Sequence, residues 1–98
     1  MFVAITWGKI KPGKWNDYMG FYTGSLQDTA KGLKGLIRRQ LLRATDDPNE
    51  GVSLAFWDSK ESWESWYTSP LRKQLTQESE LFYTGEYWIN TYEAEVTS

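Results

Sequence analysis

The chain has 98 residues, of which 40% are hydrophobic and 24% are charged. This length and balance are typical of a single globular domain and exclude a second core, a disordered polymer or a coiled coil. The sequence contains neither cysteine nor histidine, which excludes disulfides, thiol catalysis and histidine ligation of a metal or haem. We therefore expect one domain over residues 1–98, with no metal site.

The charge balance argues against two classes of partner. Eleven basic and thirteen acidic residues give a formal net charge of −2, which provides no general attraction to nucleic acid or to anionic membranes. No apolar run approaches the ~20 residues of a membrane span, and no basic segment precedes the apolar start of the chain, so no signal peptide is predicted. We expect a cytoplasmic protein that binds neither nucleic acid nor membrane.

Aromatic side chains are the unusual feature of the composition. Six tryptophans, six tyrosines and four phenylalanines make up 16% of the chain. Each ring can bury about 150–250 Å² of surface, so together they exceed what a small one-layer core needs. Two interpretations stay open. Either the surplus rings line a ligand pocket or a subunit interface, or all of them belong to the core.

The first third of the chain predicts a strand followed by a helix. Residues 2–10 are rich in β-branched and aromatic side chains, and the run ends before Pro12, which predicts a strand. From residue 14 to about residue 32, apolar side chains recur every three or four residues, as on one face of a helix. These side chains are Trp15, Tyr18, Tyr22, Leu26 and Ala30. Gly20 and Gly24 lie inside this helix at a cost of about 1 kcal/mol each relative to alanine, unless they allow a close approach to another element.

Two strands joined by a turn are predicted next. Residues 36–45 have strand composition but mixed polarity on both faces, which is typical of an edge or an interface strand. Residues 46–51 are turn formers and residues 52–57 again have strand composition, so we expect an antiparallel hairpin. Asp46 and Asp47 are interpreted as turn residues rather than as a catalytic pair of carboxylates.

The last part of the chain predicts two short helices and a strand. Asp58 or Ser59 caps a first helix that carries aromatic side chains at helical spacing. Ser69 and Pro70 open a second helix, because serine is favoured at the cap and proline at the first helical position. Residues 83–96 are rich in aromatic and β-branched side chains, which predicts the fourth strand.

The order of these elements predicts the architecture. A β-α-β-β-α-β order is that of the ferredoxin-like sandwich, an α+β fold with the helices on one face of an antiparallel sheet. The first and third strands are apolar on both sides, so the other face of the sheet needs a cover. We expect a second copy of the chain to supply it, which gives a barrel-like homodimer.

The two faces of the predicted sheet differ in side-chain size. One row of the two central strands is small and the opposite row is bulky. The small residues are Ala4, Thr6, Ser53 and Ala55. A roomy face beneath the helix that carries Trp63 and Trp66 predicts an aromatic-walled cavity for a small molecule. The alternative is that Tyr18, Tyr22 and Leu26 of the first helix fill this space.

A run of short motifs carries a family resemblance. After the Asp-Asp-Pro turn, at a fixed distance, come a strand that ends in Trp57-Asp58-Ser59, a helix with an aromatic residue, and Ser69-Pro70. Together with residues 10–14 and 41–49, these segments resemble the antibiotic biosynthesis monooxygenase (ABM) domain family of dimeric α+β barrels. The likeness runs from about residue 2 to residue 75. It implies the fold and the dimer more directly than an activity, because the fold hosts several functions.

Haem-degrading members of the superfamily differ from this chain at two positions. They share a tryptophan on the second helix, which Trp66 matches. They carry a histidine iron ligand where this chain has Thr76, and a pocket asparagine near the position of Thr6. Because the chain has no histidine, haem ligation of this type is not possible, and haem degradation is disfavoured.

Cofactor-free members oxidise polycyclic phenols or quinols with molecular oxygen, and the resemblance implies that chemistry without any cofactor. Such an enzyme favours the phenolate, holds it in a dry apolar pocket beside oxygen, and donates hydrogen bonds to the developing oxyanion. The expected partners are therefore a hydrophobic aromatic small molecule and oxygen.

The candidate site residues follow from these roles. The candidate catalytic residues are the hydrogen-bond donors Trp66, Tyr67 and Asn90. The candidate substrate-binding residues are Thr6, Tyr22, Arg39, Trp57, Ser62 and Trp63. Ser62 stands where quinone-forming members look to carry an asparagine, and it is a shorter donor. Simpler interpretations are that Trp66 belongs to the core, that Arg39 forms a salt bridge across the dimer, and that Asn90 satisfies a backbone group.

The sequence leads to three hypotheses of function. The leading hypothesis is a cofactor-independent, monooxygenase-like protein that binds a polycyclic phenol or quinol between the sheet and the helices. The alternative is a non-catalytic, small-ligand-binding or structural homodimer of the same fold, which the lack of a clear base favours. An RNA binder of this fold would need basic and aromatic residues on its central strands, and the acidic charge together with Ala4 and Ala55 argues against it.

Overall fold

The sheet has the strand order of a split βαβ arrangement. The computed structural model describes residues 1–96. Its strands are β1 (Phe2–Ile10), β2 (Leu36–Arg43), β3 (Glu50–Trp57) and β4 (Tyr83–Glu93). They form one antiparallel sheet in the order β2–β3–β1–β4, so β2 lies at an edge, as its mixed polarity predicts. The β2–β3 hairpin is also confirmed.

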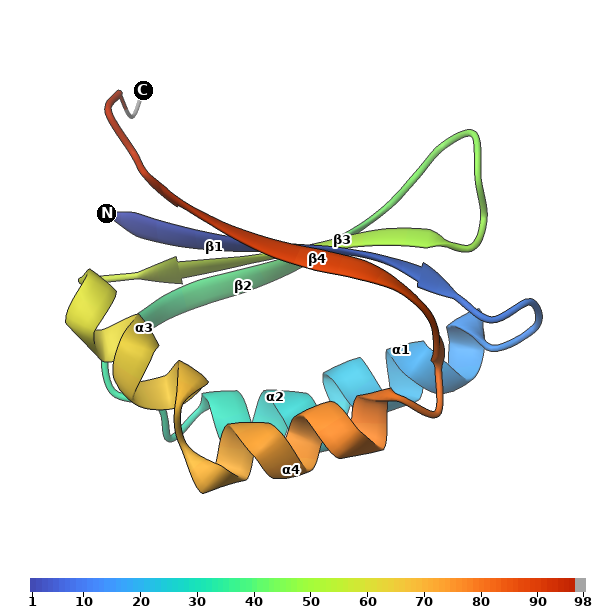
Figure 1. Ribbon diagram of the computed structural model, residues 1–98, viewed down its shortest axis with the longest axis horizontal. Helices are drawn as coiled ribbons and strands as arrows, with labels where there is room; N and C mark the ends of the chain where they lie inside the picture. Colours follow the sequence, from blue (N-terminus) through green and yellow to red (C-terminus); the bar gives the residue numbers. More distant parts are fainter. Residues whose placement is uncertain (97–98) are drawn as a thin grey trace.

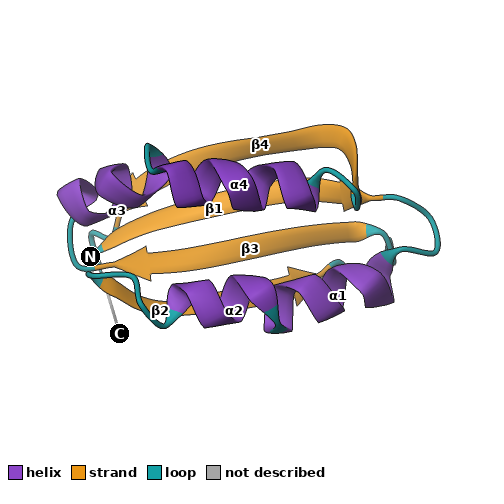
Figure 2. Ribbon diagram, turned by 90° about the horizontal axis from the view of Figure 1, so that it is seen from below, coloured by secondary structure: helices purple, strands orange, loops and turns teal. Residues whose placement is uncertain are grey.

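All the helices lie on one face of this sheet (Figure 1). They are α1 (Trp15–Thr23), α2 (Ser25–Ala30), α3 (Lys60–Tyr67) and α4 (Pro70–Ser79). Seen from the helical side, α1 with α2 and α3 with α4 form two rows that run along the sheet, with β1 and β3 between them (Figure 2). The α+β, ferredoxin-like architecture is therefore confirmed. Within residues 1–96, no helix has the length and apolar character that crossing a bilayer requires.

The prediction of one continuous helix over residues 14–32 is wrong, because the helix breaks at Gly24. The backbone of Gly24 has φ −97° and ψ −101°, outside the helical region, although its N–H still donates to the carbonyl of Gly20 at 3.0 Å. A Cβ atom at Gly24 would lie 2.8 Å from that carbonyl oxygen, so the break requires glycine. A Cβ at Gly20 would meet nothing within 4 Å. Neither glycine therefore serves a close approach to another element.

Serine caps set the start of α3 and of α4. The Ser59 hydroxyl accepts a hydrogen bond from the backbone N–H of Ser62 at 3.2 Å, so Ser59 rather than Asp58 is the cap of α3. The Ser69 hydroxyl accepts from the backbone N–H of Arg72, also at 3.2 Å, and Pro70 follows as the first helical residue. The end of α3 and the first turn of α4 are thus adjacent.

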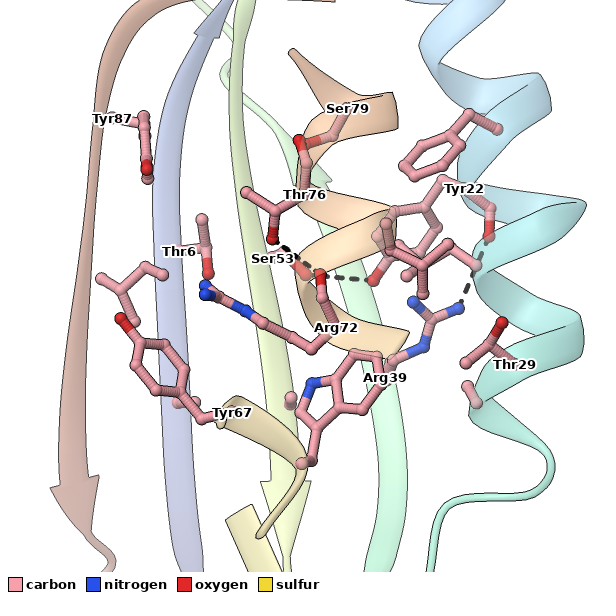
Figure 3. Close-up of a pocket in the computed structure, with 18 of the residues that line it drawn as sticks. Thr6, Tyr22, Thr29, Arg39, Ser53, Tyr67, Arg72, Thr76, Ser79 and Tyr87 are labelled. Carbon is pink, nitrogen blue, oxygen red and sulfur yellow. Dashed lines mark hydrogen bonds between the residues drawn. The ribbon is translucent and has the colours of Figure 1, made fainter. Parts of the chain in front are cut away.

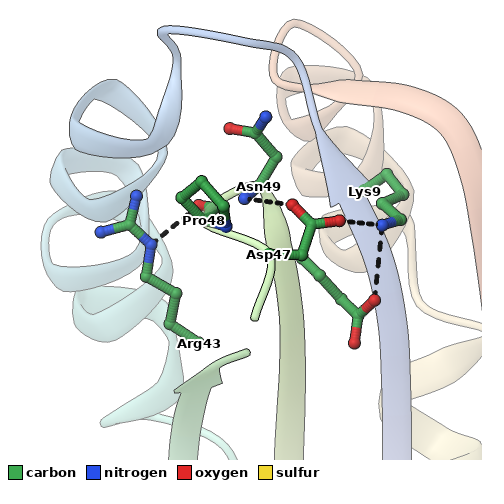
Figure 4. Close-up of polar contacts among 6 residues, drawn as sticks. Lys9, Arg43, Asp47, Pro48 and Asn49 are labelled. Carbon is green, nitrogen blue, oxygen red and sulfur yellow. Dashed lines mark hydrogen bonds and ion pairs between the residues drawn. The ribbon is translucent and has the colours of Figure 1, made fainter. Parts of the chain in front are cut away.

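The connection between β2 and β3 is fastened to β1 by charged groups (Figure 4). The Lys9 ammonium pairs with Asp47 and lies 3.4 Å from Glu50. Asp47 also accepts a hydrogen bond from the backbone N–H of Asn49 at 2.9 Å. The hydrogen bond from Lys9 lowers the pKa of the Asp47 carboxyl below its usual value, and the hydrogen bond from the Asn49 backbone lowers it further. This arrangement supports the interpretation of Asp47 as a turn residue.

The strand register separates a helix-facing side of small residues from a bulky open side. Ala4 pairs with Ala55, and Thr6 with Ser53, on the side that faces the helices. A core cluster of buried residues lies between this side and the helices. Its members are Ile10, Trp15, Tyr18, Phe21, Tyr22 and Leu75. The size contrast between the two sides, which the sequence predicts, is present.

The open side of the sheet carries several large apolar side chains. Ile5 and Leu54 are paired at its centre, and the rings of Trp7 and Trp88 stack with centroids 6.2 Å apart and planes 9° apart. Trp88 nevertheless keeps 44% of its surface exposed. No helix or strand within residues 1–96 covers this side (Figure 1).

Candidate functional site

A cavity of about 520 Å³ lies between the sheet and the helices. Its floor is formed by small side chains of β1 and β3. They are Ala4, Thr6, Ser53 and Ala55. Because these side chains are short, the helices rest on the surrounding larger residues and leave space above the centre of the sheet. The volume is within the range of small-molecule sites, roughly 300–1,000 Å³.

Aromatic rings form the walls of this cavity. The wall residues come from α1, α3, β3 and β4. They are Tyr18, Phe21, Tyr22, Trp57, Trp63, Trp66, Tyr67, Tyr83 and Tyr87. The rings of Trp63 and Tyr67 pack together with centroids 4.7 Å apart. The tyrosines of α1 thus line the space and do not fill it, so part of the aromatic surplus borders the cavity.

Two pairs of hydroxyl groups connect residues that line the cavity. The Tyr22 hydroxyl lies 3.1 Å from the Ser53 hydroxyl at the cavity floor (Figure 3). The Tyr18 and Tyr83 hydroxyls lie 2.9 Å apart. Burial raises the pKa of both Tyr18 and Tyr83 above the ordinary value. These two phenols therefore keep their protons at neutral pH and act as hydrogen-bonding groups rather than as bases.

Arg39 enters the cavity from the β2 side and is held by its own chain. Its guanidinium donates a hydrogen bond of 2.7 Å to the side-chain oxygen of Gln27 and lies 4.4 Å from the centre of the Tyr22 ring. A longer contact of 3.5 Å reaches the backbone carbonyl of Tyr22. These contacts are made within one chain and use one nitrogen of the guanidinium, Nη2. The sequence also allowed a salt bridge of Arg39 across the dimer.

Arg72 is a cavity residue that the sequence analysis missed. It lies in the first turn of α4, and its guanidinium sits 4.0 Å from the centre of the Tyr67 ring (Figure 3). Helical side chains lean toward the N-terminus of their helix, so an arginine in this turn reaches back to the end of α3. The Ser69-Pro70 start of the helix was the signal that could have revealed it.

Trp57 has an unusual position beneath the cavity. Only 2% of its surface is exposed, and its indole N–H is buried without a hydrogen-bond partner among residues 1–96. An orphan donor of this kind costs about 1–3 kcal/mol, so tight packing and not hydrogen bonding holds the Trp57 ring in place.

The sequence and the fold both have known relatives. A family model described as antibiotic biosynthesis monooxygenase matches residues 1–78. This chain belongs to the antibiotic biosynthesis monooxygenase family. No curated protein matches its sequence significantly. The family assignment fits the motifs around the turn and the second helical row.

Solved structures share the fold at low sequence identity. A conserved protein from Methanosarcina mazei Go1 is 19% identical, with a TM-score of 0.84 over 96% of this chain and 92% of that chain. SnoaB, a cofactor-independent oxygenase from Streptomyces nogalater, is 14% identical, with a TM-score of 0.84 over 98% of this chain and 94% of its own. Rv0793 from Mycobacterium tuberculosis is 11% identical, with a TM-score of 0.81 over 99% and 97% of the two chains. Identities this low establish a common fold.

Most of the predicted site residues of this family member border one space. Thr6, Tyr22, Arg39, Trp57, Trp63, Trp66 and Tyr67 all line the cavity. Ser62 does not, because its hydroxyl accepts a hydrogen bond from the Ser59 hydroxyl at 3.1 Å, beside the cap of α3. Asn90 does not either, because its partner in the register is Ile5, which places Asn90 on the open side of the sheet. Its neighbour Ile89 lines the cavity instead.

The positions that distinguish this chain from haem-degrading relatives also border the cavity. Thr6 lies on the floor and Thr76 on the α4 wall. The Thr76 hydroxyl donates a hydrogen bond of 2.9 Å to the backbone carbonyl of Arg72, so it serves the helix. Neither threonine offers the imidazole nitrogen that ligates iron in histidine-bound haem.

Proposed function

We propose that this chain is a cofactor-independent monooxygenase that oxidises a polycyclic phenol or quinol in the cavity under α3 and α4. The observation that carries the proposal is the composition of the cavity. Its floor is formed by small side chains, its walls are largely aromatic, and hydrogen-bond donors line it, among them Arg39, Trp66 and Tyr67. Flat apolar ligands suit such walls, and convergent donors suit an oxygen anion on their rim.

The proposed roles follow from hydrogen-bonding chemistry. The indole N–H of Trp66, the hydroxyl of Tyr67 and the guanidinium of Arg39 donate to the oxygen anion of the ionised substrate. Donors in a site with little water stabilise a negative charge more strongly than donors in solution. The electron-rich anion then reacts with oxygen without help from a prosthetic group.

In the proposed reaction, no residue of the cavity is assigned as the base that removes the substrate proton. Tyr18 and Tyr83 hold their protons because burial raises the pKa of each. Glu80 is the one carboxylate among residues 1–96 that lines the cavity, and it is exposed. We therefore assign the loss of the proton to ionisation of the substrate itself, which the cationic Arg39 favours.

Anthrone, a tricyclic ketone that ionises to a phenolate-like anion, is a suitable test substrate. In the balanced reaction, the methylene carbon loses two hydrogens and gains one oxygen atom from O₂, which gives anthraquinone. The second oxygen atom leaves with both hydrogens as water. We expect oxygen consumption and anthraquinone formation above the rate without protein. Trp66→Phe should lower this rate about a hundredfold, because it removes one donor to the anion.

Trp88→Phe is the matched control, since it makes the same change on the open side of the sheet. It should leave oxidation unchanged. Equal rates for Trp66→Phe and the wild type would contradict the assigned role of Trp66.

The alternative of a non-catalytic binding protein has one observation in its favour, which is the lack of a clear base in the cavity. This alternative predicts that a polycyclic phenol quenches the tryptophan fluorescence in a saturable way while no oxygen is consumed. Quenching without turnover would therefore replace the enzymatic proposal, and absence of both effects would leave a structural dimer.

We also propose that the protein is a homodimer in which two open sheet faces cover each other. Large apolar side chains on this face stay partly exposed in the single chain. Leu42, Trp88 and Tyr92 are 42%, 44% and 49% exposed. An apolar patch of this kind is typical of an interaction surface, and a two-fold axis makes one such patch complementary to itself.

A further inference from the structure

We infer that Arg72 selects an anionic ligand: its guanidinium binds an acidic oxygen, carboxylate or ionised phenol, on the aromatic molecule that the cavity holds. This inference rests on the proposed function, because it specifies the ligand class of the same cavity. It concerns a residue to which neither the family match nor the motifs assign a role.

The geometry makes Arg72 a different kind of group from Arg39. The guanidinium of Arg39 donates through one nitrogen, Nη2, to Gln27 and packs on Tyr22. The guanidinium of Arg72 has no hydrogen-bond acceptor and no carboxylate within ion-pair distance among residues 1–96, and its one close partner is the face of the Tyr67 ring, 4.0 Å away. All five of its N–H donors are therefore available to a ligand.

The position of Arg72 is fixed by its surroundings. The backbone N–H of Arg72 is bonded to the Ser69 cap, and its carbonyl accepts from the Thr76 hydroxyl. The side chain is half-buried along Tyr67 and extends into the cavity from α4 (Figure 3). A guanidinium held against an aromatic face keeps its edge free for two parallel hydrogen bonds to one acidic group.

The charges around the cavity favour an anion. Arg39, Arg72 and Lys11 line it, against the single carboxylate of Glu80 among residues 1–96. A cation that is partly removed from water and lacks a counterion costs free energy, which a bound anion recovers. The small floor residues of β1 and β3 are uncharged, so the rings of the ligand are expected over them and its acidic group at the α4 side, next to Arg72.

Two fluorescent probes test this inference. 1-Anilinonaphthalene-8-sulfonate and N-phenyl-1-naphthylamine share one aromatic skeleton and differ by the anionic sulfonate. The wild type should bind the anionic probe more tightly than the neutral one. Arg72→Gln should weaken the anionic probe about tenfold or more, as expected for a charge-assisted hydrogen bond, and should leave the neutral probe unchanged. Arg72→Lys should retain part of the preference.

Lys73→Gln is the matched control. It removes the same charge from the next residue of α4, which is exposed and does not line the cavity. It should change neither affinity. An equal effect of Arg72→Gln on both probes, or no effect on either, would overturn the role of Arg72 and leave the proposed cavity intact. Failure of the wild type to bind either probe would instead reject the cavity as a binding site, and the proposed function with it.

Discussion

The hydroxyls of Tyr18 and Tyr83 lie 2.9 Å apart, and this contact joins α1 to the first residue of β4 beside the cavity. The two rings also meet nearly edge to face, with centroids 5.5 Å apart. Tyr18 is only 3% exposed. Burial first, and the neighbouring tyrosine second, raise the pKa of Tyr18, because a phenolate here would lose its water and face a second phenol.

This arrangement predicts a loss of stability in alkali. Tyrosine in the unfolded chain ionises near pH 10, whereas folded Tyr18 keeps its proton. Above that pH the folded state therefore binds more protons than the unfolded state, and the free energy of unfolding falls, by at most about 1.4 kcal/mol per pH unit for one group. Below pH 10 the contribution is fully present. Urea denaturation at pH values on both sides of 10 measures the effect.

Tyr18→Phe should reduce this pH dependence, because the variant has no hydroxyl to ionise at this position. Identical curves for Tyr18→Phe and the wild type above pH 10 would show that Tyr18 does not control alkaline stability.

The strands could be predicted from the sequence more closely than the helices. The β-branched and aromatic composition of residues 2–10, with Pro12 shortly after it, marks β1 from its first to its last residue. The break between α1 and α2 depends on one glycine whose Cβ would meet the carbonyl of Gly20. The apolar spacing continues across Gly24, so periodicity alone cannot reveal the break.

The site shows the same limit for side chains. The alternation in β4 separates Ile89 from Asn90, but only the register with β1 decides which of them faces the helices. The sequence does not indicate Arg72 as a cavity residue, because a charged residue on a short helix is ordinarily solvated. Its role depends on a contact with Tyr67 across the junction of α3 and α4, which the Ser69-Pro70 start of α4 marks but the spacing of apolar residues does not.

Two glycine substitutions should have opposite effects on stability. Gly20 lies in α1 with nothing within 4 Å of a Cβ atom, so Gly20→Ala should stabilise the protein by about 0.5–1 kcal/mol through reduced freedom of the unfolded chain. A Cβ at Gly8 would collide with the ring of Tyr83, which Tyr18 holds in place. Gly8→Ala should therefore destabilise it by about 1–3 kcal/mol.

The midpoints of urea unfolding for the two variants and the wild type give the comparison directly. Each glycine is a control for the other, because the chemical change is the same. A destabilised Gly20→Ala would mean that α1 packs more closely than the structure describes, and a neutral Gly8→Ala would mean that Tyr83 moves freely.

The proposed dimer gives a prediction about two exposed leucines. Leu42 lies in one row of the open sheet face with Val52, Trp7 and Trp88, and it is 42% exposed. In a face-to-face dimer, Leu42→Lys would bury a charge without a partner and weaken association about tenfold or more. Leu81→Lys makes the same change at a leucine that is 65% exposed, after α4 and away from the sheet, and should leave association unchanged. Sedimentation equilibrium at micromolar concentration should show a dimer for the wild type and for Leu81→Lys, and dissociation for Leu42→Lys. A monomeric wild type, or a dimer that withstands Leu42→Lys, would mean that the open sheet face is not the contact between two copies.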